Sequence, residues 1–167
     1  ISLLPCMSKL LEKIVFNHIY KHATEHSLLC ETQSGYRPGH GTQLQLLHLT
    51  QNMFSSLDQG NDFTAIYLDI AKYFDKIWHR GLLLKCEKEF GIRGSLLRWL
   101  GSYLKDRKQR VKVGDSYSTF QVINAGCPQG SVLGPLLALI YLNDLSNKVT
   151  NDVLFFFCRR HLFILAT

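Results

Sequence analysis

The sequence of 167 residues lacks several features that mark large classes of protein. Its five cysteines are widely spaced and include no C-x-x-C pair, which argues against a zinc knuckle or a disulfide framework. No uninterrupted apolar run is long enough to span a bilayer, and no basic segment precedes Pro5 as in a signal peptide. We therefore expect a reduced intracellular compartment (nucleus or cytoplasm) and no membrane, and the sequence begins like an internal piece of a longer protein.

Internal repeats, low-complexity tracts and linkers are also absent, which predicts a single domain. Hydrophobic residues make up 46% of the chain and charged residues 19%, so the chain can bury a core and long disorder is excluded. Basic residues outnumber acidic ones by 19 to 13, which gives a net charge of +6. A positive excess favours a polyanionic partner such as nucleic acid or an anionic membrane surface, without choosing between them.

Hydrophobic periodicity predicts an α+β fold in which helices and strands alternate unevenly. We expect helices at residues 8–25 with Ser8 as the N-cap, from Thr42 onward with Gln45 in a capping box, and at 79–90, 95–105 and 132–145. Strands are expected at 63–70 and 153–157, and a hairpin at 109–113 and 118–123 turned at Gly114-Asp115. Trp78 and Trp99 fall in helical patterns and are expected to be buried or partly buried.

Asp69 is notable because it ends a run of apolar and uncharged residues that starts at Phe63. A carboxylate at the end of a buried strand is costly unless a divalent cation or a basic residue such as Lys72 pairs with it. A side chain that caps a turn is the ordinary interpretation of a lone Asp, and Asp75 alone would be an ordinary helix-start acid. Neither acid by itself therefore indicates a function.

Four segments, taken in order, are far more specific. They resemble four motifs of reverse transcriptases from non-LTR, LINE-type retrotransposons. The R-P-I-S-L-L…K-x-x-E-K segment of that family is similar to residues 1–13 (ISLLPCMSKLLEK), and its fingers motif Q-x-G-F-R…T is similar to residues 33–42 (QSGYRPGHGT). Motif A of the family is similar to residues 68–75 (LDIAKYFD), and motif B is similar to residues 126–137 (GCPQGSVLGPLL). The resemblance covers nearly the whole chain. It implies a reverse-transcriptase-like palm, an antiparallel sheet backed by helices, at about 63–167, with part of the fingers at about 1–62 and the thumb cut off.

The resemblance implies RNA-directed DNA synthesis, with an RNA template, a DNA primer and deoxynucleoside triphosphates as partners. Asp69 would be the catalytic, metal-binding carboxylate, and the backbone carbonyl of Ile70 would be a neighbouring ligand. The expected cofactor is Mg²⁺, because this ion prefers hard oxygen ligands and keeps places for phosphate oxygens.

Four further residues would bind the nucleotide, and each also has an ordinary structural interpretation. Arg37 would contact the triphosphate through its guanidinium, or be a solvated loop charge. Phe74 would lie beneath the incoming sugar and exclude a ribose 2′-hydroxyl, or be a core side chain. Gln129 and Gly130 would line the nucleotide pocket, where a glycine lets the backbone approach the base, or form the turn before a helix.

The third motif of the family, F/Y-x-D-D, is missing from its expected place. Phe155–Phe157 form the expected strand, but Cys158-Arg159-Arg160-His161 follow, and no acid occurs after Asp152. The guanidinium groups of Arg159 and Arg160 would repel Mg²⁺ and could pair with Asp69 instead. We therefore predict that the chain as written is inactive as a polymerase.

A frameshift is our hypothesis for this segment. The codons TGC AGA CGA CAC encode Cys158 to His161, and the same letters read one base later encode Ala-Asp-Asp-Thr. The rival is a divergent, inactive enzyme, and two alternative functions are a non-catalytic nucleic-acid-binding remnant and a pseudogene translation. We also expect the apolar residues 162–165 to form an unpaired strand end that is prone to aggregate.

Two other features lie outside these motif roles. Residues 105–110 (KDRKQR) form a basic cluster between a helix and a strand, which could follow a template or primer backbone or be a solvated turn. Cys127 has the chemistry of a nucleophile, but no His/Asp arrangement accompanies it in the sequence, so we discount that role.

Overall fold

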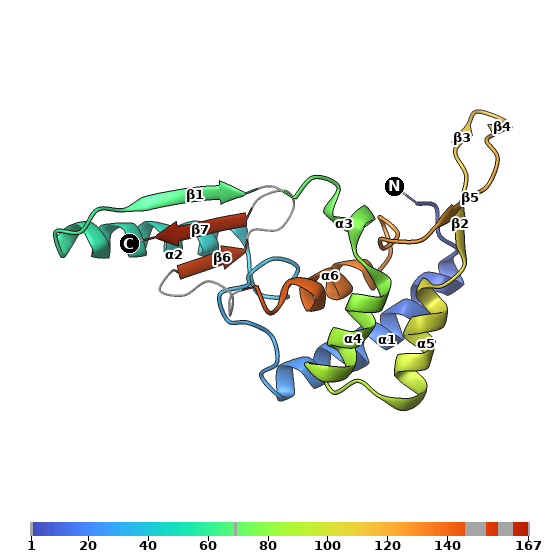
Figure 1. The fold of residues 1–167 in the computed structure, drawn as a ribbon, viewed down its shortest axis with the longest axis horizontal. Helices are drawn as coiled ribbons and strands as arrows, with labels where there is room; N and C mark the ends of the chain where they lie inside the picture. The colour runs from blue at the N-terminus through green and yellow to red at the C-terminus, as the bar shows by residue number, and fades with distance from the viewer. Residues whose placement is uncertain (1, 69, 146–152, 157–161, 167) are drawn as a thin grey trace. The chain divides into compact units, whose positions relative to one another are not determined.

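The computed structural model describes residues 2–68, 70–145, 153–156 and 162–166. Its helices are α1 (Cys6–Glu25), α2 (Thr42–Asp58), α3 (Tyr73–Lys76), α4 (His79–Lys88), α5 (Gly94–Leu104) and α6 (Gly134–Leu142). Its strands are β1 (Thr64–Leu68), β2 (Arg107–Gln109), β3 (Lys112–Val113), β4 (Ser116–Tyr117), β5 (Gln121–Ile123), β6 (Val153–Phe156) and β7 (Leu162–Ala166) (Figure 1). This mixture of helices with small antiparallel sheets agrees with the α+β composition that the sequence predicts.

The chain forms two compact units, and each is made of segments that are distant in the sequence. The helical unit comprises Ile1–His18 and Lys72–Tyr141, and the sheet unit comprises Ile19–Ala71 and Leu142–Thr167. Helix α1 contributes its first part to the helical unit and its second part to the sheet unit. The boundaries of these units differ from the predicted boundary between fingers and palm near residue 62, and that division stays a prediction.

The core of the helical unit lies around α4, α5 and α6. Its buried apolar side chains are Ile77, Leu82, Cys86, Phe90, Ile92, Leu100, Leu104, Cys127, Leu133, Leu136, Leu137, Leu139 and Ile140. Helix α6 is apolar on all sides and is buried from Leu136 to Ile140, as expected for a helix enclosed by a core. No helix in the described part of the chain is long and apolar enough to cross a membrane.

The sheet unit contains a three-stranded antiparallel sheet in the order β1-β7-β6, whose strands lie side by side in Figure 1. Ile164 of the central strand β7 lies opposite Ile66 on one side and Leu154 on the other. The expectation of an unpaired strand end at residues 162–165 is therefore wrong. Because this apolar run has a hydrogen-bonded neighbour on each side, it presents no open edge.

Asn143 ties together two parts of the sheet unit. Its side-chain oxygen accepts a hydrogen bond from the backbone N–H of Cys30 at 2.8 Å, and its side-chain nitrogen donates to the carbonyl of Leu28 at 2.8 Å. These bonds use the donor and the acceptor of one amide, so they define its orientation. The segment after α6 is thereby held against the loop that follows α1.

Both predicted helix caps are wrong. Helix α1 begins at Cys6 because the carbonyl of Pro5 accepts the first helical hydrogen bond, from Lys9, so Ser8 lies within the helix. Helix α2 is preceded by Gly41, whose extended backbone makes it the N-cap without any side-chain hydrogen bond. Thr42 is therefore already helical, and the Gln45 side chain is buried instead of reaching back to the helix start.

Three other features differ from the sequence prediction. Helix α3 spans four residues, which is too short for a periodic signal, and strand β7 was not predicted as a paired strand. Trp78 is 58% exposed, because it is the extended residue just before α4 and lies outside the helical face. Trp99 is half-buried as expected and stacks on Tyr103, with 5.5 Å between the ring centroids.

Candidate functional site

Within the helical unit, residues 73–79 lie against residues 126–129. The carbonyl of Phe74 accepts a hydrogen bond from the N–H of Cys127, and the carbonyl of Ile77 accepts one from the N–H of Gly126, both at 2.8 Å. The imidazole Nε2 of His79 lies 2.7 Å from the carbonyl oxygen of Gly126. Main-chain hydrogen bonds therefore join the segments that resemble motif A and motif B.

Gly126 makes this close approach possible. Its φ of +87° lies in the region that favours glycine. A Cβ atom at this position would lie 2.7 Å from both the Asp75 Cα and the Phe74 carbonyl oxygen. Both of these are backbone atoms, which cannot rotate away as the end of a side chain can. Any other residue would therefore separate the two segments.

Gln129 and Asp75 connect the same two segments through their side chains. The Gln129 amide nitrogen donates to the two carboxylate oxygens of Asp75 at 3.2 and 3.4 Å, and both residues are exposed. The main-chain carbonyl of Gln129 accepts a hydrogen bond from the N–H of Ser2 at 2.7 Å. Gly130 follows with a φ of +97° and is also exposed. Asp75 thus orients Gln129, a role that the sequence did not reveal.

Phe74 is half-buried and is not one of the fully buried residues of the core. Its ring meets the ring of Tyr73 edge-on, with 5.6 Å between the centroids. The Tyr73 hydroxyl donates to the carbonyl of Ala138 in α6 at 2.7 Å. The structure therefore holds Phe74 next to the Asp75–Gln129 contact without burying the residue fully.

Glu12 supports the turn between Gln129 and α6, and sequence reasoning missed it. Its side chain is only 2% exposed, and its Oε2 accepts hydrogen bonds from the N–H groups of Val132 at 2.7 Å and Leu133 at 3.3 Å. Its other oxygen accepts a bond from the Ser8 hydroxyl at 3.3 Å. The N–H groups at a helix start lack helical partners, and a carboxylate there is also favoured by the helix dipole.

The turn before α6 is completed by a second oxygen. The Ser131 hydroxyl accepts a hydrogen bond from the N–H of Gly134 at 2.8 Å. A Cβ at Gly134 would lie 2.7 Å from that oxygen, so a larger residue would disturb the bond. No local pattern marks Glu12 as buried, because Leu10 and Leu11 just before it are 57% and 48% exposed.

The two buried thiols of the helical unit, Cys86 and Cys127, resist deprotonation. Burial raises the pKa of Cys86 to about 12, and it raises the pKa of Cys127 to about 12 as well. The thiolate is the nucleophile, so neither residue suits a nucleophilic role at neutral pH. This agrees with the sequence argument against Cys127 as a nucleophile.

We expect iodoacetamide at pH 8 to alkylate the exposed Cys6 while Cys86 and Cys127 stay unmodified in the folded chain. A pKa of about 12 leaves on the order of one thiolate in ten thousand at that pH, and burial also blocks the reagent. Peptide mass spectrometry would measure the labelling. Guanidinium should expose both thiols, and labelling of Cys127 as fast as Cys6 without denaturant would contradict the buried position.

Arg37 and Ile70 belong to the sheet unit. Arg37 Nη1 donates to the carbonyls of Cys30 at 2.9 Å and Gln33 at 3.2 Å, so the half-buried guanidinium closes its own loop. The interpretation of Arg37 as a solvated loop charge is therefore wrong. Ile70 is 40% exposed. Asp69, Arg159 and Arg160 lie outside the described residues.

The loop around Arg37 and the start of α2 contain buried polar atoms without hydrogen-bond partners among the described residues. They are Gln33 Oε1, Arg37 Nε, His40 Nδ1 and Gln45 Nε2. Burial, followed by the positive charges of Arg37 and His48, lowers the pKa of His40 and so favours its neutral form. The loop thus keeps hydrogen-bonding capacity that its own residues do not use.

Comparison with known proteins gives a consistent family. Residues 1–163 match the family described as reverse transcriptase (RNA-dependent DNA polymerase). The chain is 41% identical over 145 residues to the "Probable RNA-directed DNA polymerase from transposon BS" of Drosophila melanogaster. The aligned region covers 87% of this chain and 16% of that protein. It is also 34% identical over 147 residues to the "RNA-directed DNA polymerase from mobile element jockey" of Drosophila funebris. That aligned region covers 88% of this chain and 16% of the relative.

A third relative is the "Probable RNA-directed DNA polymerase from transposon X-element" of Drosophila melanogaster, with 36% identity over 145 residues, or 87% of this chain and 16% of the relative. The chain thus spans about a sixth of the length of these relatives. The family match includes all four segments that resemble reverse transcriptase motifs. Within the helical unit, Phe74 of the segment that resembles motif A is hydrogen-bonded to Cys127 of the segment that resembles motif B. The chain belongs to the reverse transcriptase family, and its relatives are the enzymes of non-LTR, LINE-type retrotransposons.

Proposed function

We propose that this chain is part of an RNA-directed DNA polymerase that extends a DNA primer on an RNA template. The observation that carries the proposal is the contact of residues 73–79 with residues 126–129, closed by main-chain hydrogen bonds at Gly126 and Cys127. Its relatives are named RNA-directed DNA polymerases, which supports the proposal. In this proposal, the fingers include residues from 1 to about 62, and the palm includes residues from about 63 to 167.

Gln129 and Gly130 form one wall of the nucleotide pocket in this proposal. Two observations support this role: both residues are exposed, and Gly130 presents bare backbone at a φ of +97°. Phe74 limits the space beneath the sugar, so that a 2′-hydroxyl is excluded. Two observations support this role of Phe74: the residue is only half-buried, and it is the neighbour of Asp75, which Gln129 contacts.

Arg37 contacts the triphosphate in this proposal, and its Nε supplies the contact. The Nη1 group is already used by two carbonyls of its own loop, whereas Nε is buried without a partner among the described residues. A guanidinium held in place from one side loses little freedom when it binds a phosphate with the other. The pKa of His40 near it is lowered, which disfavours a competing positive charge there.

Mg²⁺ is the ion that the family leads us to expect, with Asp69 and the Ile70 carbonyl as ligands. Among the described residues, no group of three or more His, Cys, Asp or Glu side chains lies close enough to hold a metal, and Asp69 is not one of those residues. Mg²⁺ therefore stays an expectation from the family, and we derive no step through it.

Primer extension tests this proposal. The chain alone should give no product from deoxynucleotides and Mg²⁺ on a primed RNA template, because no acid follows Asp152. A chimera should restore synthesis if the 145 aligned residues of this chain alone replace their counterparts in the transposon BS protein and the downstream sequence of that protein is kept. Gel analysis of the extended primer measures both.

The transposon BS protein itself serves as the positive control. Asp69→Asn in the chimera should abolish the product, as expected for a catalytic carboxylate. A product from the unaltered chain would contradict its inactivity. A folded chimera that makes no product, while the parent protein does, would overturn the proposed function.

A further inference from the structure

Residues 107–123 form a ribbon that the nucleotide site does not use. Strand β2 pairs with β5, and β3 pairs with β4 around the turn at Gly114, which confirms the predicted hairpin. Ser118 bridges the gap between the two ladders: its N–H donates to the carbonyl of Val111 at 3.0 Å, and its hydroxyl accepts from the Val111 N–H at 2.9 Å. Figure 1 shows β3 and β4 at the outer end of this ribbon.

One face of the ribbon combines cations with aromatic rings. The Arg110 guanidinium carbon lies 4.0 Å from the centroid of the Tyr117 ring and 4.8 Å from that of Phe120. The Lys112 ammonium lies 5.4 Å from the Tyr117 centroid. These four residues are the basic–aromatic face. Successive side chains of a strand point to opposite faces, so Val111 and Val113, which follow Arg110 and Lys112 in the sequence, belong to the opposite face.

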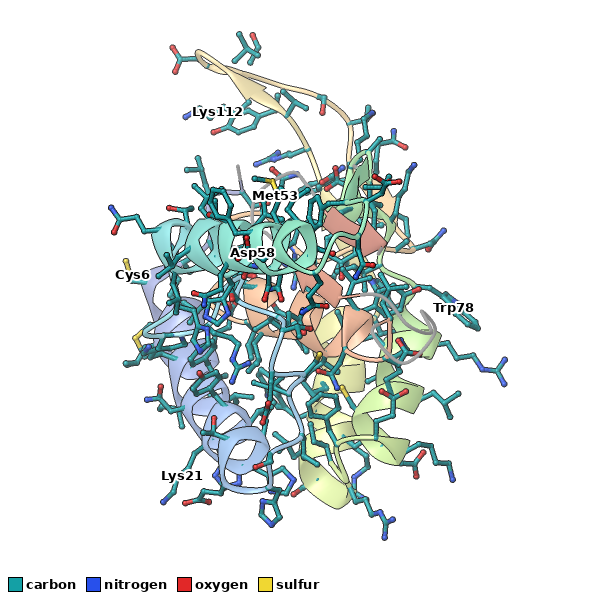
Figure 2. All side chains as sticks on the ribbon, turned by 90° about the vertical axis from the view of Figure 1, so that its left-hand side faces the viewer. Cys6, Lys21, Met53, Asp58, Trp78 and Lys112 are labelled. Carbon is teal, nitrogen blue, oxygen red and sulfur yellow. The ribbon has the colours of Figure 1, made fainter. Side chains whose placement is uncertain are left out.

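The ribbon is exposed on both faces among the described residues. Tyr117 is 51% exposed and Phe120 is 59% exposed, and every residue from 108 to 122 is exposed. Figure 2 shows Lys112 on the ribbon, away from the helices of the same unit. A ribbon of paired strands without a core is marginally stable by itself, so a partner on either face would stabilise it.

Positive charge is concentrated in this part of the chain. Residues 105–123 contain five basic and two acidic side chains, which is half of the net charge of +6 in about a ninth of the sequence. Asp106 is paired with Lys105 at 3.8 Å, so Asp115 in the turn is the acid left to oppose the basic residues of the ribbon. The surface therefore fits a polyanion that also has flat apolar groups.

We propose that the basic–aromatic face binds single-stranded nucleic acid. The Arg110 and Lys112 side chains contact phosphates, and the exposed rings of Tyr117 and Phe120 stack on bases, which are the two elements of sequence-independent single-strand binding. An acidic peptide would match the charges but would leave both rings without a stacking partner. The choice of nucleic acid rests on the proposed polymerase function, but binding needs no catalysis and is measured separately.

Fluorescence anisotropy with a labelled single-stranded RNA of about 20 nucleotides tests the proposal on the full chain, at several salt concentrations. Arg110→Gln with Lys112→Gln should weaken binding about tenfold and reduce the salt slope by about 1.4, since each phosphate contact on a single strand contributes about 0.7. Tyr117→Ala with Phe120→Ala should weaken binding about tenfold without changing the salt slope, because stacking releases no counterions.

Two double variants serve as controls. Lys88→Gln with Arg98→Gln removes the same charge from exposed positions of α4 and α5, and Val111→Thr with Val113→Thr alters the opposite face. Both should leave RNA affinity within about twofold of the unaltered chain. Equal weakening by the ribbon and helix charge variants would show that binding depends on net charge alone, and would overturn the proposal.

Asp115→Asn is a gain-of-function test, which loss of folding cannot imitate. Removing the acid in the turn should tighten RNA binding about twofold. An unchanged or weaker affinity in this variant would overturn the assigned face. Polyglutamate that displaces the RNA at a similar concentration would overturn nucleic acid as the partner.

Discussion

Gly126→Ala should lower the free energy of unfolding by about 3 kcal/mol, which we expect to be one of the two largest single-residue effects in this chain. Two costs combine. Alanine at a φ of +87° is strained by about 1 kcal/mol, and its Cβ would press on the Asp75 Cα and the Phe74 carbonyl oxygen at 2.7 Å. Because those atoms are backbone, residues 73–79 must move away from the loop. Chemical denaturation followed by circular dichroism measures the loss.

Gly91→Ala is the matched control for this substitution. Gly91 has a φ of +64°, but a Cβ there would meet nothing within 4 Å. It carries the backbone cost alone, about 1 kcal/mol. If the two variants lose the same stability, the close approach of Gly126 to Asp75 is not what makes glycine necessary.

Glu12→Ala is the second substitution with a large expected effect, again about 3 kcal/mol. It leaves the N–H groups of Val132 and Leu133 without their acceptor in a buried place and opens a cavity beside them. Glu12→Gln keeps the shape and one oxygen that can accept the same bonds. We expect it to cost about 1 kcal/mol, the difference between an ionised and a neutral acceptor.

Glu25→Ala on the same helix is the control. Glu25 faces Lys21 at 3.7 Å in an exposed pair, which contributes little to stability. Its replacement should change the free energy of unfolding by less than about 0.5 kcal/mol. A loss for Glu12→Ala no larger than that of Glu25→Ala would mean that the Val132 and Leu133 bonds do not hold the turn.

Gly126 and Glu12 act on the two ends of one segment. Gly126 holds its beginning against residues 73–79, and Glu12 holds its end where α6 starts. Gln129 and Gly130 lie between these two anchors. The proposed wall of the nucleotide pocket is therefore supported from both sides by residues that need no contact with a nucleotide.

Local sequence patterns predicted most helices and strands because their signals lie within one element. Helix α1 and strand β1 agree with their predicted ranges to within two residues, and the hairpin turns where Gly114-Asp115 indicates. The caps failed because the start of a helix depends on which backbone carbonyl accepts the first bond, at Pro5 and Gly41, and not only on residue type. Strand β7 was missed because its pairing depends on β1, about a hundred residues earlier.

The sequence by itself determined the family, through four motifs in order, and the absence of any acid after Asp152. Only the tertiary structure decided which ordinary residues support the motifs. Glu12 and Val132 are 120 positions apart, and Asp75 and Gln129 are 54 positions apart. The cost of burying a carboxylate, or of adding a Cβ at Gly126, depends on the atoms that folding brings nearby, and periodicity contains no information about them.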